Sequence, residues 1–153
     1  MMLLIIGLFI AACTAPLRQQ RPDAIAVEHT LETFWTVLRS GDRTSLERQL
    51  TTDATLIRMD GRSIGEERPL SMVLGRPEER TLLVLAERER LIKFQQPTPQ
   101  RASVETFLDV TRQDGVHRGR IQWEFVRNDG KWLLQRVKTS IWIFPNPSRG
   151  GGP

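Results

Sequence analysis

The chain has 153 residues, of which 39% are hydrophobic and 26% are charged, as expected for a single globular domain. Its formal net charge is +4, but the arginines and lysines are interleaved with acidic residues and form no basic block, which argues against nucleic-acid binding. Because the chain has a single cysteine, it cannot form an internal disulfide. One cysteine and two histidines are too few for the usual metal sites, so we expect no bound metal. We also expect no cofactor.

The N-terminal residues, MMLLIIGLFIAA, form an uninterrupted apolar run that ends at Cys13. A helix that crosses a bilayer needs about 20 residues, whereas this shorter run is typical of a secretory signal peptide over residues 1–12. The tetrapeptide Ile10-Ala11-Ala12-Cys13 resembles the bacterial lipobox, although the run lacks an opening Lys or Arg. The resemblance implies cleavage before Cys13 and diacylation of its thiol. The alternative is a buried N-terminal helix, but the run has no polar residues at helical spacing.

Residues 13–22 are polar and rich in proline, and they predict an extended tether after the lipidated cysteine. Two or three acyl chains on one residue give stable membrane anchoring, which a single chain does not. We therefore expect a lipid-anchored protein of the cell membrane or outer membrane, with its domain on the periplasmic or extracellular side. The absence of Asp after Cys13 resembles the outer-membrane sorting default of Gram-negative lipoproteins.

Three helices are expected at the start of the folded domain. The first covers residues 23–40 and ends at Gly41, because four apolar residues recur there at helical spacing, namely Val27, Leu31, Phe34 and Leu38. A second helix is expected over residues 44–50, capped by Asp42 or Thr44. A third short helix is expected over residues 66–74.

The strands expected next are separated by turn residues. A short strand over residues 54–59 ends at an Asp-Gly turn, and two further Asp-Gly pairs predict antiparallel hairpins. Four longer strands are expected over residues 81–94, 102–112, 118–127 and 132–144, followed by a disordered tail over residues 145–153. Helices followed by antiparallel strands indicate an α+β domain over residues 23–144.

Two segments of this domain resemble the nuclear transport factor 2-like superfamily, which includes ketosteroid isomerase-like proteins. One is Phe34–Asp42 (FWTVLRSGD) together with Asp53-Ala54, and the other is Asp129–Trp132 (DGKW) before the last strand. The resemblance implies a cone-shaped fold, in which a curved antiparallel sheet wraps around about three N-terminal helices and forms a pocket. Isomerases, hydrolases, carriers and interaction modules share this fold, so it does not identify a function.

The candidates for a catalytic carboxylate are Asp109 and Glu105. The ketosteroid isomerases and epoxide hydrolases of the superfamily use a tyrosine beside their carboxylates, and this chain has no tyrosine. With the turn at residues 114–115 setting the register, Asp109 is expected roughly opposite Gln122. A solvated outer sheet face explains both carboxylates equally well.

The two histidines are candidates for a general base, because imidazole titrates near neutral pH. His29 falls opposite the apolar stripe of the first helix and is expected in solvent. His117 lies beside the expected turn at residues 114–115 and is expected in a loop.

Residues of the last strands suggest a ligand site or an interface. Arg136 and Lys138 share one strand face; if Trp123 lies on that face they suit an acidic ligand, and a shift of one residue turns them outward. Trp142 lies in the apolar segment IWIF, residues 141–144, which would cover both faces of the sheet. This segment predicts a contact with an envelope protein or with a second copy of the chain.

The sequence thus predicts a membrane-anchored lipoprotein whose domain binds a ligand or a protein at the cell envelope without catalysis. The alternative is an isomerase- or hydrolase-like enzyme that uses a pocket carboxylate, Asp109 or Glu105. A deep pocket in which one of these carboxylates meets a second polar group would favour the enzyme.

Overall fold

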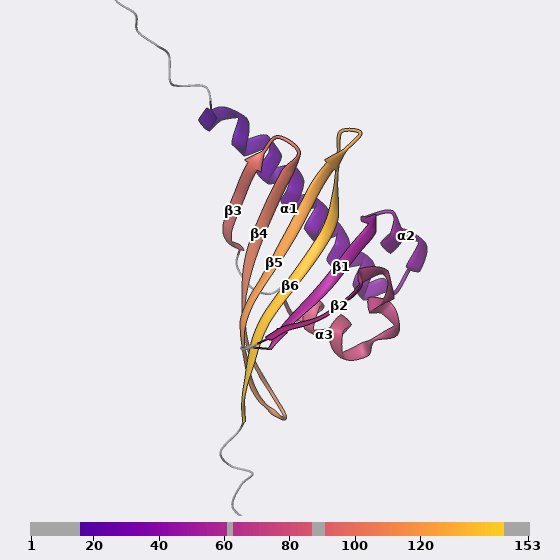
Figure 1. The fold of residues 1–153 in the computed structure, drawn as a ribbon, viewed down its shortest axis with the longest axis vertical. Helices are drawn as coiled ribbons and strands as arrows, with labels where there is room; N and C mark the ends of the chain where they lie inside the picture. Colours follow the sequence, from indigo (N-terminus) through magenta and orange to yellow (C-terminus); the bar gives the residue numbers. More distant parts are fainter. Residues whose placement is uncertain (1–15, 61–62, 87–90, 146–153) are drawn as a thin grey trace, which may run out of the picture.

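The computed structural model describes residues 16–60, 63–86 and 91–145, in which one curved sheet of six strands packs against helices (Figure 1). This confirms the expected α+β class with a curved sheet on N-terminal helices. The elements in chain order are α1 (Pro16–Ser40), α2 (Arg43–Glu47), β1 (Leu50–Asp60), β2 (Ser63–Pro69), the 3₁₀ helix η1 (Leu70–Gly75), α3 (Pro77–Leu85), β3 (Leu91–Thr98), β4 (Arg101–Arg112), β5 (Gly115–Asn128) and β6 (Lys131–Pro145).

The first helix contains the expected apolar stripe, since Val27, Leu31, Phe34 and Leu38 are all fully buried. Its start differs from the expectation: α1 begins at Pro16, so residues 16–22 are helical and not an extended tether. Proline is favoured at a first helical position, and the intervening Leu, Arg and Gln residues are good helix formers. Pro22 removes one backbone hydrogen bond without ending the helix. The expected signal peptide and Cys13 lie outside the described residues.

The second helix is capped at Asp42, as one of the two expected alternatives, and the carboxylate of Asp42 accepts a hydrogen bond from the backbone N–H of Ser45. The helix ends at Glu47, and Leu50 is the first residue of β1. The pKa of Asp42 is lowered, first by the hydrogen bond from the Ser45 hydroxyl and then by that from the Ser45 N–H. The cap therefore stays ionised and fixes the turn between α1 and α2.

Two expected elements are wrong in part. Residues 66–74 do not form one helix, because the chain stays in β2 to Pro69 and only then enters η1. Residues 81–85 belong to α3 and not to a strand, and β3 begins at Leu91. A short apolar run such as TLLVL suits a buried helix or a strand equally, while Pro77 and two glutamates in the first turn favour the helix.

The strand order is β2-β1-β6-β5-β4-β3, and every neighbouring pair is antiparallel except β1 and β6. The sheet is therefore mixed, whereas the sequence predicted an antiparallel one. Parallel neighbours cannot be joined by a tight turn. Here β2, η1, α3, β3, β4 and β5 all lie between β1 and β6 in the chain. The expected hairpins β4–β5 and β5–β6 are present, and β1 also pairs antiparallel with β2, where the sequence predicted no second strand. The last strand includes Pro145, and the rest of the expected tail lies outside the described residues.

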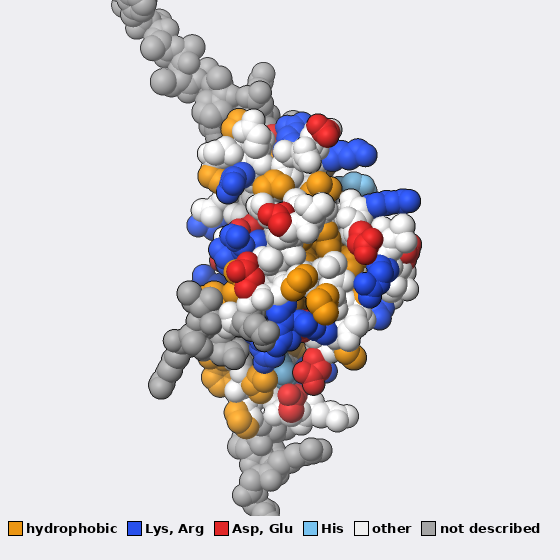
Figure 2. Space-filling view, turned by 45° about the vertical axis from the view of Figure 1, so that its right-hand side comes forward, with side chains coloured by type: hydrophobic (Ala, Val, Ile, Leu, Met, Phe, Trp, Pro, Cys, Tyr) orange, Lys and Arg blue, Asp and Glu red, His pale blue; other side chains and the backbone are white. Residues whose placement is uncertain are grey.

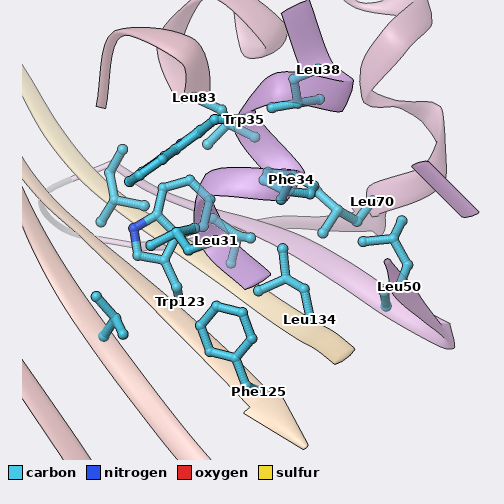
Figure 3. Packing of buried hydrophobic residues seen from close by; sticks show 14 of the residues in the cluster. Leu31, Phe34, Trp35, Leu38, Leu50, Leu70, Leu83, Trp123, Phe125 and Leu134 are labelled. Atoms are coloured by element: carbon cyan, nitrogen blue, oxygen red, sulfur yellow. The ribbon is translucent and has the colours of Figure 1, made fainter. Parts of the chain in front are cut away.

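The concave face of the sheet holds an aromatic cluster, in which Phe34 and Trp35 of α1 point toward Trp123 of β5 (Figure 3). Both rings meet Trp123 edge to face, with centroids 5.9 and 5.6 Å from it. The Trp123 indole also donates a hydrogen bond of 3.0 Å to the hydroxyl of Thr106 on β4. These bulky side chains fill the middle of the concave face.

Candidate functional site

A cavity of about 400 Å³ lies at the end of the concave face, between α3 and the β4–β5 turn. Its floor comes from β1 and β6, its cover from α3, and one wall from the β4–β5 turn and the start of β5. The apolar lining residues are Leu56, Met59, Leu82, Leu83, Ile141 and Ile143. Figure 2 views the side that carries α2 and α3, and toward its lower end basic, acidic and hydrophobic side chains lie side by side.

The polar lining residues are Arg58, Glu78, Glu79, Arg112, Gln113, Asp114, His117 and Thr139. Two of them form a close pair: Oδ1 of Asp114 lies 2.9 Å from Nε2 of His117. The His117 side chain is only 8% exposed, whereas Asp114 is 59% exposed, so the pair links the cavity wall to solvent. A buried imidazole held by a carboxylate has a defined orientation.

The short β4–β5 turn creates this pair. Arg112 pairs with Gly115, so Gln113 and Asp114 alone form the turn, and Asp114 lies three residues before His117. Asp109 therefore pairs with Arg118, four residues from the Gln122 expected from the sequence. The hydrogen bond with His117 is the largest cause that lowers the pKa of Asp114, which keeps its carboxylate ionised.

His117 does not lie in a loop, as the sequence suggested, but is buried in β5. It shares a strand face with Ile121, Trp123 and Phe125, because alternate residues of a strand point the same way. Continuing that alternation back past Gly119 would have placed His117 on the concave face. His29 is exposed on α1, as expected.

The cover of the cavity is tied to the sheet through Glu79 of α3. Its carboxylate meets Arg68 of β2 at 3.3 Å and Arg76, just before the helix, at 3.5 Å. These contacts hold the first turn of α3 against β2. Glu79 is thereby engaged in structural ion pairs, although one side of it borders the cavity.

The structure does not bring the carboxylate candidates Asp109 and Glu105 to this cavity. Asp109 lies 2.9 Å from Arg118, and Glu105 lies 3.4 Å from Arg120, each across the β4–β5 ladder. Their strand neighbours Val104, Thr106 and Leu108 point to the core, so both carboxylates belong to the outer, convex face.

Arg136 and Lys138 also point outward, where both meet Glu124 of β5, at 3.4 and 2.6 Å. A bulge in β6 explains their direction. Phe125 pairs with Leu134 and Glu124 with Arg136, so Gln135 is an extra residue in the ladder. Trp132 and Leu134 point inward before the bulge, and Val137 and Thr139 after it. Trp123 is fully buried on the opposite face, so the three residues do not form one site.

The segment around Trp142 is exposed. Trp142, Ile143 and Phe144 have 49%, 48% and 53% of their surface in solvent. Ile143 shares the face of Val137 and Thr139 and lines the cavity mouth, whereas Trp142 and Phe144 lie on the convex side. The role of this segment as an interface stays a prediction.

A second hollow lies at the other end of the sheet, around Phe94, Ser103 and Gln122. Its acidic lining residue, Glu124, is already held by Lys138, and it contains no histidine. Among the described residues, no group of three Asp, Glu, His or Cys side chains could hold a metal ion. Within the same ranges, no helix is both long and apolar enough to span a membrane.

The sequence matches no family model and no curated protein. Solved structures do resemble the chain. A nuclear transport factor 2-like protein of unknown function from Shewanella baltica OS155 has a TM-score of 0.55 at 12% identity, over 86% of this chain and 99% of its own. A similar protein of unknown function from Shewanella oneidensis MR-1 has a TM-score of 0.54 at 12% identity, over 77% of this chain and 98% of its own.

A conserved protein from Planctomyces limnophilus DSM 3776 has a TM-score of 0.55 at 17% identity, over 81% of this chain and 99% of its own. At such low identities these similarities concern the fold alone. Together with the curved six-stranded sheet and its helices, they show that this chain has the nuclear transport factor 2-like fold.

Proposed function

We propose that this domain binds a small amphipathic molecule in the cavity beside His117, and that a lipid on Cys13 holds it at a membrane of the cell envelope. The observation that carries the binding proposal is the cavity itself. Its volume of about 400 Å³ falls in the usual range of small-molecule sites, about 300–1,000 Å³. Its lining combines apolar side chains with polar and charged ones, which suits a molecule that has both an apolar and a polar part.

The lining suggests how a ligand would lie. An apolar part would contact Leu82 and Leu83 of α3 in the cover of the cavity and Ile141 of β6 in its floor. A polar part would meet His117, Arg112 or Gln113 at the turn. A small organic acid with an aromatic or aliphatic body has this chemistry.

The anchoring proposal rests on the apolar run and the lipobox-like tetrapeptide before Cys13. The helix α1 has 25 residues, about 37 Å at 1.5 Å per residue, and it begins at the end of the domain opposite the β4–β5 turn (Figure 1). A lipid attached just before α1 would therefore hold the domain with its cavity directed away from the membrane surface.

The binding proposal is tested by titrating 4-phenylbutyrate, a soluble amphipathic acid, into the full-length chain in lipid nanodiscs. The NMR chemical shifts of the backbone amides should change in α3, in the β4–β5 turn and at the end of β6. Empty nanodiscs titrated in the same way serve as the blank. Leu82→Trp, which fills the cavity, should weaken binding at least tenfold. The matched control is Thr81→Trp, because Thr81 is exposed on the same helix and does not line the cavity. Shifts confined to other parts of the domain, or equal affinity in both variants, would refute the proposal.

A further inference from the structure

The pair of His117 and Asp114 has the geometry of a general base held by a carboxylate. We propose that His117, oriented by Asp114, activates a water molecule for the hydrolysis of a carboxylic ester bound in the cavity. This inference rests on the proposed function, because the ester has to enter the same cavity. It goes beyond binding because it assigns the site a reaction and a substrate class.

The hydrogen bond determines which ring nitrogen can act as the base. An ionised carboxylate only accepts hydrogen bonds, so the proton between Oδ1 of Asp114 and Nε2 of His117 belongs to the imidazole. In the neutral ring the other nitrogen, Nδ1, then carries a free electron pair. A histidine whose tautomer and orientation are fixed by a carboxylate is the arrangement that general-base catalysis requires.

The position of the pair in the fold supports a role in chemistry. A surface pair would be of little use to a bound ligand, but the imidazole is buried in the cavity wall with only 8% of its side chain exposed. Asp114, at 59% exposed, lies at the outer end of the pair, where solvent can reach the site. Water and an apolar substrate can therefore meet at His117.

The neighbouring groups suit the charge that develops in ester hydrolysis. Arg112 ends β4, pairs with Gly115 across the turn and lines the same cavity. A guanidinium near the reacting carbonyl stabilises the negative oxygen of the tetrahedral intermediate. The apolar side chains of Leu82, Leu83 and Ile141 suit the acyl group of the ester.

The reaction needs only water as its second reactant. Nδ1 of His117 takes a proton from water while the water oxygen forms a bond to the carbonyl carbon, and the carbonyl electron pair moves to its oxygen. When that pair returns, the bond between the carbon and the alcohol oxygen breaks. The leaving oxygen takes the proton from Nδ1, which releases an acid and an alcohol and restores the neutral imidazole.

The test uses p-nitrophenyl butyrate as substrate for the full-length chain in lipid nanodiscs, with empty nanodiscs as the blank. The wild type should hydrolyse it faster than the same concentration of free imidazole, and His117→Gln should lower kcat at least 100-fold. His29→Gln is the matched control, because His29 is exposed on α1, and it should leave the rate unchanged. A wild type no faster than imidazole, or a His117→Gln variant with wild-type rate, would overturn the inference.

Asp114 is a positioning residue in this scheme, and its effect should fall on kcat. Asp114→Asn should lower kcat about tenfold and leave KM within a factor of two, since in this scheme the carboxylate orients the His117 imidazole and does not bind the ester. Asp109→Asn is the control: it removes an exposed carboxylate of β4 and should change neither kcat nor KM. An Asp114→Asn variant with raised KM and unchanged kcat would contradict the assigned role.

Binding of 4-phenylbutyrate separates the two proposals. If the wild type and His117→Gln bind the acid in the cavity but the wild type does not hydrolyse the ester, only the hydrolysis proposal fails. If the acid does not bind in the cavity at all, both proposals fail.

Discussion

The guanidinium of Arg80 on α3 caps the C-terminal end of α1: its Nε donates a hydrogen bond of 2.7 Å to the backbone carbonyl of Leu38. One of its terminal nitrogens donates a second bond, of 2.8 Å, to the carbonyl of Arg39. The last carbonyls of a helix have no partner within the helix and carry partial negative charge, so a cation suits them. Through this contact α1 fixes the position of α3, which covers the cavity.

Arg80→Ala should lower the free energy of unfolding by about 1–3 kcal/mol, because two charge-assisted hydrogen bonds are lost. It should also weaken binding of 4-phenylbutyrate, since α3 becomes less well positioned. Urea denaturation and the amide-shift titration measure the two effects. Arg43→Ala, at an exposed residue of α2, is the control. Equal stability of the Arg80 variant and the wild type would show that the cap contributes nothing.

Thr106→Val should destabilise the domain by about 1–3 kcal/mol, because the buried indole N–H of Trp123 then has no acceptor. The volume of the side chain hardly changes, so the loss reports the hydrogen bond and not the packing. Thr111→Val alters an exposed threonine of the same strand and should have little effect. The comparison is made by urea denaturation, and similar midpoints for the two variants would contradict the expectation.

Gly119→Ala should cost about 1–3 kcal/mol by overpacking. A Cβ at Gly119 would lie 2.0 Å from the backbone oxygen of Ser140, so β5 and β6 would have to separate next to the cavity. Gly75→Ala is the control, because nothing lies within 4 Å of a Cβ there. Thermal unfolding of both variants tests this. The prediction fails if Gly119→Ala has the same melting temperature as the wild type.

The hydrogen bond between Asp114 and His117 should stabilise the folded domain at neutral pH but not at strongly acidic pH. The pKa of Asp114 is lower in the folded chain than its ordinary value of 3.8, chiefly because of the hydrogen bond with His117. A lowered carboxylate pKa stabilises the fold above about pH 3.8, and this contribution is lost as the pH falls through the folded value. Asp114→Asn should therefore be less stable than the wild type at pH 7, with a smaller difference at pH 3. A difference that is constant between these pH values would exclude this linkage.

Cys13→Ala should leave the protein without a lipid and release it from the membrane fraction. The physical reason is that the thiol of Cys13 is the only one in the chain to which the acyl groups could be attached. Membrane fractionation and mass spectrometry of the wild type and the variant measure the two consequences. Retention of an unmodified variant in the membrane would defeat the anchoring proposal.

The sequence determined the features that depend on neighbouring residues. The stripe of α1 follows from apolar residues at helical spacing, the restriction of the α2 cap to Asp42 or Thr44 from their short polar side chains, and the β4–β5 and β5–β6 hairpins from their Asp-Gly pairs. The apolar run and the tetrapeptide that precede Cys13 are local features of the same kind, and they support the proposed lipid anchor. These properties need no knowledge of distant parts of the chain.

The tertiary structure decided which side chains meet. The two-residue β4–β5 turn set the register that places Asp109 opposite Arg118, and the bulge at Gln135 turned Arg136 and Lys138 outward. The parallel pairing of β1 with β6 joins segments that are far apart in the sequence. Side chains in a strand alternate, so one extra residue reverses every direction that follows it. The cavity and its His117–Asp114 pair therefore depend on pairing between strands, which local sequence patterns do not specify.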